Sequence, residues 1–398
     1  MLDPIPPAPE WLRQAVEPLA LRLHLPALAD HSHEVIVTFI GYLLIHYVLS
    51  PWLSPKLFPR HYPTLNKRTK LNWDVHVVSL VQSTFICAVA LWVLFTDEER
   101  KSMNSGERVY GYTGSCVLIS SLAVGYFIYD LIVSTVYVKL FGIGMLFHAI
   151  SALWVFSFGY RPFVNFYAPT FILYELSSPF LNIHWFLDKV NMTGSSFQWY
   201  NGMLLLFVFF SCRLIWGTWQ SVYVYMDMFN ALKQTWSASP SALPFTPVDI
   251  TAQVFQARND GSLCINEACV RANAEISKYS HYTAGGVPTW LVITYVTSNL
   301  ILNGLNYYWF SKMIETVMKR FRGPAAGSEA SAKEKRNPRE ENKENSVEDL
   351  AQKAVLDAAA KLEEEEGSLF LGDNASVAQS AATGVDSGLT KELRNRRA

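Results

Sequence analysis

Long apolar runs alternate with short polar connectors through most of the chain. A membrane-spanning helix needs about 20 mostly apolar residues, and seven runs reach that length. The pattern therefore predicts an all-α protein, a polytopic membrane bundle of about seven helices over residues 35–53, 75–95, 112–138, 140–158, 163–186, 202–226 and 288–310. Only a turn near Lys139 separates the third helix from the fourth, so these two form an antiparallel pair. Pro169 and Pro179 predict kinks in the fifth helix.

Polar stretches divide the chain into four parts. We predict an N-terminal arm (1–34), the first transmembrane helix with a basic loop (35–66), a membrane domain (67–310) that includes a polar loop (227–287), and a charged tail (311–398). The tail lacks the apolar content needed to fold alone, which predicts disorder, apart from a short solvated helix over residues 346–366. Residues 11–29 of the arm fit either an amphipathic surface helix or a plain soluble arm.

Basic residues in the short loops predict the orientation of the bundle. Such residues concentrate on the cytosolic side, and they cluster between Lys56 and Lys70 and again after residue 310. The N-terminus is then outside the cytosol, the tail inside it, and loop 227–287 in the lumen. The sequons at Asn191 and Asn374 are cytosolic in this scheme and unglycosylated, so glycosylation at Asn191 would invert it.

Composition agrees with a membrane protein and excludes several other classes. The chain is 50% hydrophobic and only 17% charged, whereas soluble domains are usually about a quarter charged. A net charge of −1 and the lack of a basic patch with interleaved aromatic residues argue against nucleic acid. We expect no metal site, because there is no C-x-x-C pair and no set of ligands spaced within a single helix.

The five cysteines fall into two groups. Cys87, Cys116 and Cys212 lie in apolar runs and are predicted to be small buried hydrophobic residues. Cys264 and Cys269 lie in the polar loop, where a lumenal location favours a disulfide and two free thiols are the alternative.

The apolar stretch 122–187 carries Asp130, His148 and Glu175. Ionisable groups inside a membrane are costly and usually face the bundle interior. Asp130 and His148 lie about nine residues before and after the turn at Lys139, which is about 14 Å from that surface and close to the middle of a core about 30 Å thick. Glu175 and Arg213 reach similar depths from their own helix ends. The sequence therefore predicts a polar layer at mid-depth, with Asp130, His148 and Glu175 as catalytic candidates.

Other polar residues belong to the same predicted layer. Glu175 shares one helix face with two of them, at spacings of three and seven residues. The candidate contacts to a bound molecule are His76, Gln82, Tyr126, Tyr129, Ser178, Asn182, Arg213 and Asn299. Structural alternatives stay open: an ion pair of Arg213 with Asp130 or Glu175, interhelical bonds from the asparagines around Asn299, and a packing role for His148.

Four motifs, in order, resemble the TLC-domain (TRAM-LAG1-CLN8) family, and most closely its transmembrane-protein-56-like branch. They are LNWDVHVVSLVQS at residues 71–83, GYFIYDL at 125–131, LFHAISAL at 146–153 and YELSSPFLNIHWFL at 174–187. The resemblance implies a helical barrel in the endoplasmic reticulum, or a related membrane, that is open to an acyl chain.

The same family includes ceramide synthases, which transfer a fatty acyl group from coenzyme A to a sphingoid amine. Their motif has two adjacent histidines; His148 matches the first, and Ala149 stands at the second. Glu175 matches the acidic residue downstream. Loss of one histidine weakens the case for acyl transfer, which needs a proton acceptor at the amine.

Three functions follow from these observations. The first is binding, sensing or moving acyl lipids in lipid homeostasis, with no cofactor. The second is acyl transfer to a membrane lipid, sphingolipids included, with acyl-CoA as co-substrate. His148 would be the base, and Glu175 or Asp130 would orient it. Arg213 would meet a phosphate or a developing negative charge. The third is a structural or chaperone-like membrane protein. The expected partners are membrane lipids; a homodimer and a cytosolic partner for the tail are further candidates.

Overall fold

The computed structural model describes residues 1–237, 256–257, 263–264, 270, 274–283 and 285–321. Four predictions lie outside these residues: the disordered tail beyond residue 321, the helix over residues 346–366, the sequon at Asn374, and the pairing of Cys269. The buried states predicted for Cys87, Cys116 and Cys212 are confirmed.

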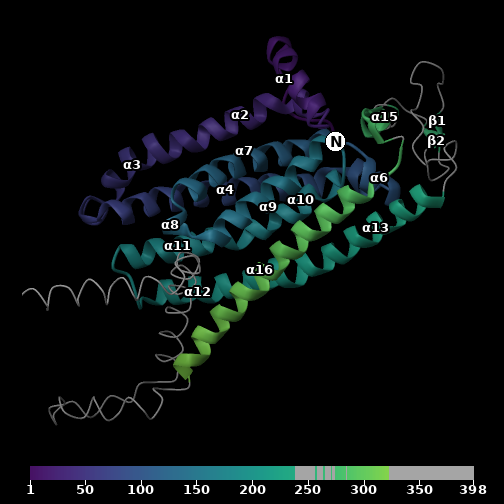
Figure 1. Ribbon diagram of the computed structural model, residues 1–398. Coiled ribbons are helices and arrows are strands. Elements are labelled where there is room, and N and C mark those ends of the chain that lie inside the picture. The colour runs from purple at the N-terminus through teal and green to yellow at the C-terminus, as the bar shows by residue number, and fades with distance from the viewer. Residues whose placement is uncertain (238–255, 258–262, 265–269, 271–273, 284, 322–398) are drawn as a thin grey trace, which may run out of the picture.

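Helices dominate the described part of the chain, and the predicted all-α class is confirmed (Figure 1). The first half contains α1 (Glu10–Arg22), α2 (Leu28–Leu44), the π-helical η1 (Ile45–Leu49), α3 (Ser50–Leu57), η2 (Tyr62–Thr64), α4 (Lys67–Thr96), α5 (Glu98–Lys101), α6 (Ser105–Tyr110), α7 (Gly114–Val136), α8 (Val138–Phe141) and α9 (Ile143–Ser157). The second half contains η3 (Phe158–Tyr160), η4 (Asn165–Tyr167), α10 (Ala168–Phe171), η5 (Ile172–Ser177), α11 (Ser178–Lys189), α12 (Ser196–Phe209), the π-helical η6 (Phe210–Trp216), α13 (Gly217–Ser237), the two-residue antiparallel strands β1 (Gln256–Ala257) and β2 (Leu263–Cys264), α15 (Ser280–Thr283) and α16 (Thr289–Phe321).

The central element is α7, which packs most extensively against α2 and α9. Its sequence GSCVLISSLAVG consists of small and aliphatic residues, so neighbouring helices can approach on several sides. Gly125 marks the closest approach: a Cβ atom there would lie 2.8 Å from Val35 O and from Thr38 Cβ of α2. The antiparallel turn predicted near Lys139 is present as α8 followed by Gly142, whose φ of 85° suits glycine.

Five helical stretches are long and apolar enough to cross a membrane, judged by length and composition within the described residues: 28–57, 67–96, 105–136, 143–160 and 196–237. Their apolar side chains also point outward, as on α9, where an exposed stripe runs through Ile143, Phe147, Ile150 and Trp154. A polytopic membrane bundle is therefore the architecture of this chain, while the count of seven spans stays a prediction.

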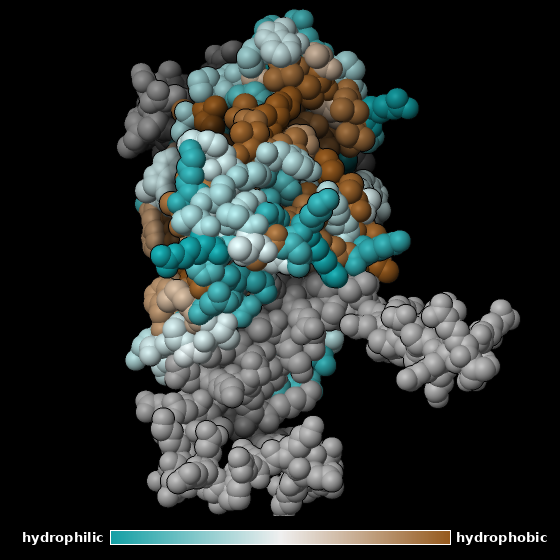
Figure 2. All heavy atoms as spheres, turned by 90° about the vertical axis from the view of Figure 1, so that its left-hand side faces the viewer, coloured by the Kyte–Doolittle hydropathy of each residue, from teal (hydrophilic) through white to brown (hydrophobic). Residues whose placement is uncertain are grey.

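Connecting turns gather at the two ends of the bundle. Figure 1 shows α3, α8 and the α11–α12 turn at the left-hand end, and α1, α6 and α15 toward the other. Figure 2 looks onto the left-hand end, where hydrophilic side chains gather across the middle beside hydrophobic ones. The connection between α3 and α4, residues 58–66, and the basic residues on either side of it lie at this end, and their cytosolic location stays a prediction.

The predicted fifth helix is present as an unbroken helical run over residues 165–189, but its geometry changes along the way. Pro169 and Pro179 stand in the first turns of its two α-helical parts, α10 and α11, with the 3-10 segment η5 between them. Proline has no N–H to donate and its fixed φ suits the first helical turn, so it begins a helix more readily than it bends one.

The polar loop also begins later than predicted. Helix α13 continues to Ser237, ten residues beyond the expected boundary at Asp227. Asp227 is buried there. Its carboxylate accepts two hydrogen bonds from Arg108, at 2.5 and 2.7 Å, and one from the Tyr167 hydroxyl at 2.6 Å, which compensate for its burial. In the N-terminal arm, α1 is a helix with Trp11 exposed.

Two glycines test the close approach of α2 and α7. Gly125→Ala should destabilise the protein by about 1–3 kcal/mol, because the added methyl group forces the helices apart. Gly41→Ala on α2 is the matched control: a Cβ there meets nothing within 4 Å, so we expect a gain of about 0.5–1 kcal/mol. Thermal unfolding in detergent measures both, and equal effects of the two substitutions would contradict this account of the packing.

Candidate functional site

Two predicted site residues, Arg213 and Glu175, and the buried His46 lie in segments that depart from α-helical geometry. Arg213 lies in the π-helical η6, Glu175 in the 3-10 segment η5, and His46 in the π-helical η1. Such distortions redirect side chains and are frequent at functional sites. Arg213 and His46 are buried in these segments, and the Glu175 side chain is 12% exposed.

Arg213 is the hub of the interior hydrogen bonds. Its guanidinium donates to the Tyr174 carbonyl at 2.8 Å, Ser177 Oγ at 3.0 Å, Asn306 Oδ1 at 3.1 Å and Ser178 Oγ at 3.1 Å. Its nearest carboxylate oxygen is Glu175 Oε1, 4.0 Å away. Because these bonds reach acceptors on η5, α11 and α16, Arg213 acts as a brace between those elements and its own segment η6.

Glu175, Ser178 and Asn182 share one side of η5 and α11, as predicted. The Ser178 hydroxyl donates to Glu175 Oε2 at 2.8 Å. Asn182 Oδ1 lies 2.6 Å from His76 Nδ1, and its amide donates to Ser79 Oγ at 3.0 Å. His76 also stacks on Trp185, with ring centroids 4.3 Å apart. These contacts join α4 to α11.

The asparagines of α16 form a second branch of the network. Asn303 Oδ1 accepts from the Tyr174 hydroxyl at 2.8 Å, and its amide donates to Asn299 Oδ1 at 2.9 Å and to Ser221 Oγ at 2.9 Å. Asn299 also accepts from the Tyr225 hydroxyl at 2.5 Å. These asparagines therefore join α16 to η5 and α13. This agrees with the alternative in which they form bonds between helices.

Asp130, His148 and Glu175 approach one another from α7, α9 and η5. Glu175 and Arg213 lie within electrostatic range of His148, and Glu175 lies within range of Asp130. Asp130 accepts a long hydrogen bond of 3.4 Å from Ser134 Oγ. His148 contacts Phe127 and Trp309 edge-on or tilted, and its buried Nδ1 has no hydrogen-bond partner among the described residues. No contact in the described structure orients His148 as a catalytic base.

Gln82 is the clearest example of a buried polar side chain without a hydrogen-bond partner among the described residues. It lies at the centre of the 30-residue helix α4, one turn from Ser79. Its relative exposure is 0%, yet neither its amide nitrogen nor its amide oxygen has a hydrogen-bond partner within the described part of the chain. A buried unpaired polar group costs about 1–3 kcal/mol, so this amide requires an explanation.

Tyr126 and Tyr129 lie on the other side of α7, toward α2. The Tyr129 hydroxyl lies 2.6 Å from His46 Nδ1, and the rings of Tyr42 and Tyr126 meet edge-on at 5.4 Å. Both tyrosines lie within electrostatic range of Asp130, and Tyr126 also lies within range of Glu175.

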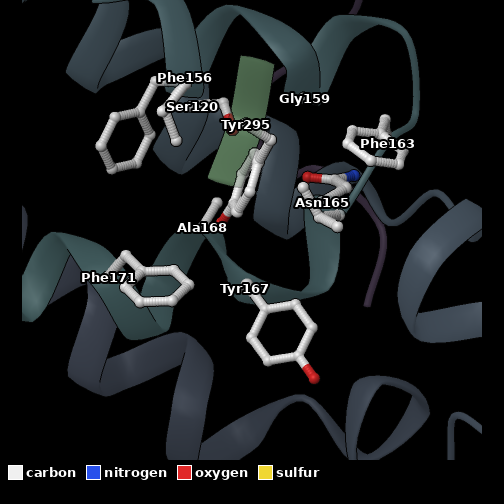
Figure 3. Close-up of a pocket in the computed structure, with 11 residues that line it drawn as sticks. Ser120, Phe156, Gly159, Phe163, Asn165, Tyr167, Ala168, Phe171 and Tyr295 are labelled. Carbon is white, nitrogen blue, oxygen red and sulfur yellow. The ribbon is translucent and has the colours of Figure 1, made fainter. Parts of the chain in front are cut away.

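A small cavity is separate from this network (Figure 3). It lies among α7, α9, η4 and α16, with Ser120, Asn165 and Tyr295 among its lining residues, and its volume is about 20 Å³. That volume suits one water molecule and is too small for a lipid head group. It is not the site that the sequence predicted.

Comparison with known proteins decides the family. The TLC domain model matches residues 72–315. The chain belongs to the TLC domain family. An uncharacterised TLC domain-containing protein of Schizosaccharomyces pombe is 34% identical over 320 residues, covering 80% of this chain and 90% of that protein.

Two further relatives show the range of TLC proteins that resemble this one. Topoisomerase I damage affected protein 4 of Saccharomyces cerevisiae is 29% identical over 305 residues, covering 75% of this chain and 88% of the relative. TLC domain-containing protein 4 of Homo sapiens is 29% identical over 181 residues, covering 45% and 67%. No solved structure matches the chain.

The matched TLC region contains every predicted site residue, from His76 to Asn299. A group of ionisable side chains outside it escaped the sequence reasoning: Asp3, His31 and Glu34. The expectation of no metal site considered spacing within single helices, whereas this group joins His31 and Glu34, three residues apart on α2, to Asp3 of the arm. The dense run DHSHE at residues 30–34 was the available signal.

Arg213→Lys distinguishes a brace from a phosphate-binding residue. Lysine keeps the charge but cannot reproduce the planar fork, so we expect a loss of roughly 2–3 kcal/mol in unfolding free energy from the lost charged hydrogen bonds. Thermal unfolding in detergent measures it, with the exposed Arg13→Lys of α1 as control. Unchanged stability together with selective loss of a bound phospholipid would instead make Arg213 a ligand contact.

Proposed function

We propose that this TLC domain protein binds the head group of a membrane lipid in its polar interior and handles that lipid as part of lipid homeostasis. The observation that carries the proposal is the Gln82 amide, which is fully buried and unpartnered beside a network in which most other polar groups are satisfied. An amide can donate and accept at once, as a hydroxyl, amine or ester of a lipid requires.

The arrangement of charge favours particular head groups. Asp130 and Glu175 supply two carboxyl groups, against the one guanidinium of Arg213, which already donates to four protein acceptors. Because the carboxyl groups outnumber the guanidinium, an uncharged or amine-bearing head group is more complementary than a phosphate. The lipid tail would then lie against the apolar helix surfaces.

Acyl transfer is the second candidate, and His148 supports it. Its ring stands near Glu175 with a buried, unpartnered Nδ1, and it matches the first histidine of the ceramide synthase motif. A substrate amine or hydroxyl held against that nitrogen would complete a general base. Acyl-CoA would be the co-substrate, and no other cofactor is proposed.

Location and partners extend the same proposal. We place the protein in the endoplasmic reticulum membrane, where acyl lipids of this kind are made. A homodimer and a cytosolic partner for the tail remain predictions that follow from the sequence.

Gln82→Leu tests the lipid site. Removing an unsatisfied buried amide should leave stability unchanged or raise it by about 1–2 kcal/mol, while lipid that co-purifies with the protein falls at least severalfold by mass spectrometry. Gln198→Leu is the matched control: Gln198 is equally buried but bonded to Gly194 and His184, so stability should fall and bound lipid should persist. Equal lipid content in wild type and Gln82→Leu would contradict a head-group role.

His148→Ala separates an enzyme from a binder. Purified protein is incubated with labelled acyl-CoA and a panel of lipid amines and alcohols. Product that forms with wild type and disappears with folded His148→Ala establishes acyl transfer. A co-purified lipid without turnover supports binding, and lower stability with unchanged lipid supports the purely structural alternative.

A further inference from the structure

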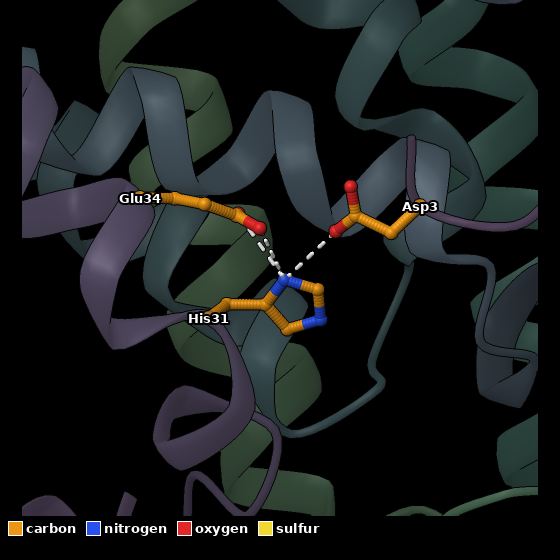
Figure 4. Close-up of side chains that lie close together, drawn as sticks. All are labelled: Asp3, His31 and Glu34. Atoms are coloured by element: carbon orange, nitrogen blue, oxygen red, sulfur yellow. Dashed lines mark hydrogen bonds and ion pairs between the residues drawn. The ribbon is translucent and has the colours of Figure 1, made fainter. Parts of the chain in front are cut away.

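The N-terminal arm meets α2 through three side chains that converge on one point. Figure 4 shows Asp3, His31 and Glu34 directed toward one another. His31 Nδ1 lies 3.0 Å from Glu34 Oε1 and 3.1 Å from Asp3 Oδ2. The three ligand atoms all lie within 4.8 Å of one another.

Burial makes this arrangement costly without a further positive charge. His31 and Glu34 are each 4% exposed, and the Asp3 side chain is 14% exposed. A single Nδ1–H would face both Glu34 oxygens and Asp3 Oδ2, and Asp3 Oδ2 makes no hydrogen bond within the described residues. With both carboxylates ionised, even a protonated His31 leaves the trio with one net negative charge in a poorly solvated place.

Neighbouring groups hold the three donors in position. The other ring nitrogen of His31 lies 2.7 Å from the Tyr112 hydroxyl, the kind of outer contact that orients metal-binding histidines. Asp3 Oδ1 accepts from the Ile5 N–H at 2.8 Å, which leaves Oδ2 free for the trio. Glu34 follows His31 by one helical turn on α2.

A second histidine, His33, lies next to this group of side chains. Both of its ring nitrogens are buried and have no hydrogen-bond partner in the described part of the chain. Its Nε2 lies 3.9 Å from Glu34 Oε1. Buried polar groups without a hydrogen bond are rare in native proteins. This imidazole also lies beside a carboxylate that already faces a second imidazole, and a ligand bound between them would supply a partner.

We propose that Asp3, His31 and Glu34 bind a divalent metal ion of the zinc class, with His33 as the nearest further donor. Tetrahedral zinc with ligand bonds near 2.0–2.1 Å places donor atoms about 3.3 Å apart, so the observed 3.0 and 3.1 Å require an opening of a few tenths of an ångström. The ion replaces the proton on His31 Nδ1 and balances two carboxylates. A histidine nitrogen favours such an ion over magnesium or calcium.

The ion would link three parts of the chain. Asp3 belongs to the segment before α1, His31 and Glu34 to α2, and Tyr112 to the connection between α6 and α7. The site lies outside the matched TLC region of residues 72–315 and apart from Gln82 and His148. The role of the metal ion is therefore to link the arm to the bundle. The proposal of a metal site does not depend on the proposal of a lipid site.

Zinc binding by tag-free, full-length protein in detergent tests the proposal. After dialysis against metal-free buffer, titration with Zn²⁺ against a chromophoric chelator should show one tight site per chain. Asp3→Asn and Glu34→Gln should each weaken it at least tenfold. Glu10→Gln is the matched control, since Glu10 is an exposed carboxylate of α1 near the same arm. Zn²⁺ should raise the melting temperature of wild type and of the control only.

Two results would overturn the site. One is the lack of a stoichiometric Zn²⁺ site in wild type; the other is equal affinity in Asp3→Asn, Glu34→Gln and the control. If Glu34→Gln does not fold, Asp3→Asn in the arm still decides. X-ray absorption at the zinc edge of loaded wild type then provides a second measurement: imidazole nitrogen and carboxylate oxygen at about 2.0–2.1 Å support the assignment, and any other ligand set rejects it.

Discussion

The cost of burying polar groups among apolar helices controls the interior of this protein. In lipid every such group must find a partner inside the bundle, and Arg213 shows how the chain meets this demand. One guanidinium serves four acceptors on η5, α11 and α16. Those bonds hold helices that have little hydrophobic drive to associate within a membrane.

Local departures from α-helical geometry make this network possible. Arg213 lies in the π-helical η6, and its guanidinium reaches the Tyr174 carbonyl and the Ser177 hydroxyl of the 3-10 segment η5. Pro169 and Pro179 divide the fifth predicted helix into α and 3-10 parts, which frees backbone carbonyls that a regular α-helix would use. This segment is thus where the backbone itself becomes part of the polar interior.

The buried polar groups are of two kinds: those with a hydrogen-bond partner and those without one among the described residues. Arg213, Asn299 and Asn182 are tied to other helices and hold the bundle together. Gln82 and the Nδ1 of His148 have no partner among the described residues, so they are the positions that a bound molecule would use. The same contrast appears in the arm, where Asp3 and His33 are under-satisfied beside a well-positioned His31.

The sequence alone determined the all-helical membrane architecture, most span positions and the TLC relationship, because long apolar runs and ordered motifs are local properties. It also predicted one layer for Asp130, His148, Glu175 and Arg213, since depth follows from counting residues along a helix. Only the tertiary structure decided what each polar group does. Whether Arg213 braces helices, whether Gln82 stays unpaired, and whether Asp3 meets His31 and Glu34 depend on contacts between distant segments and on π and 3-10 distortions that periodicity does not encode.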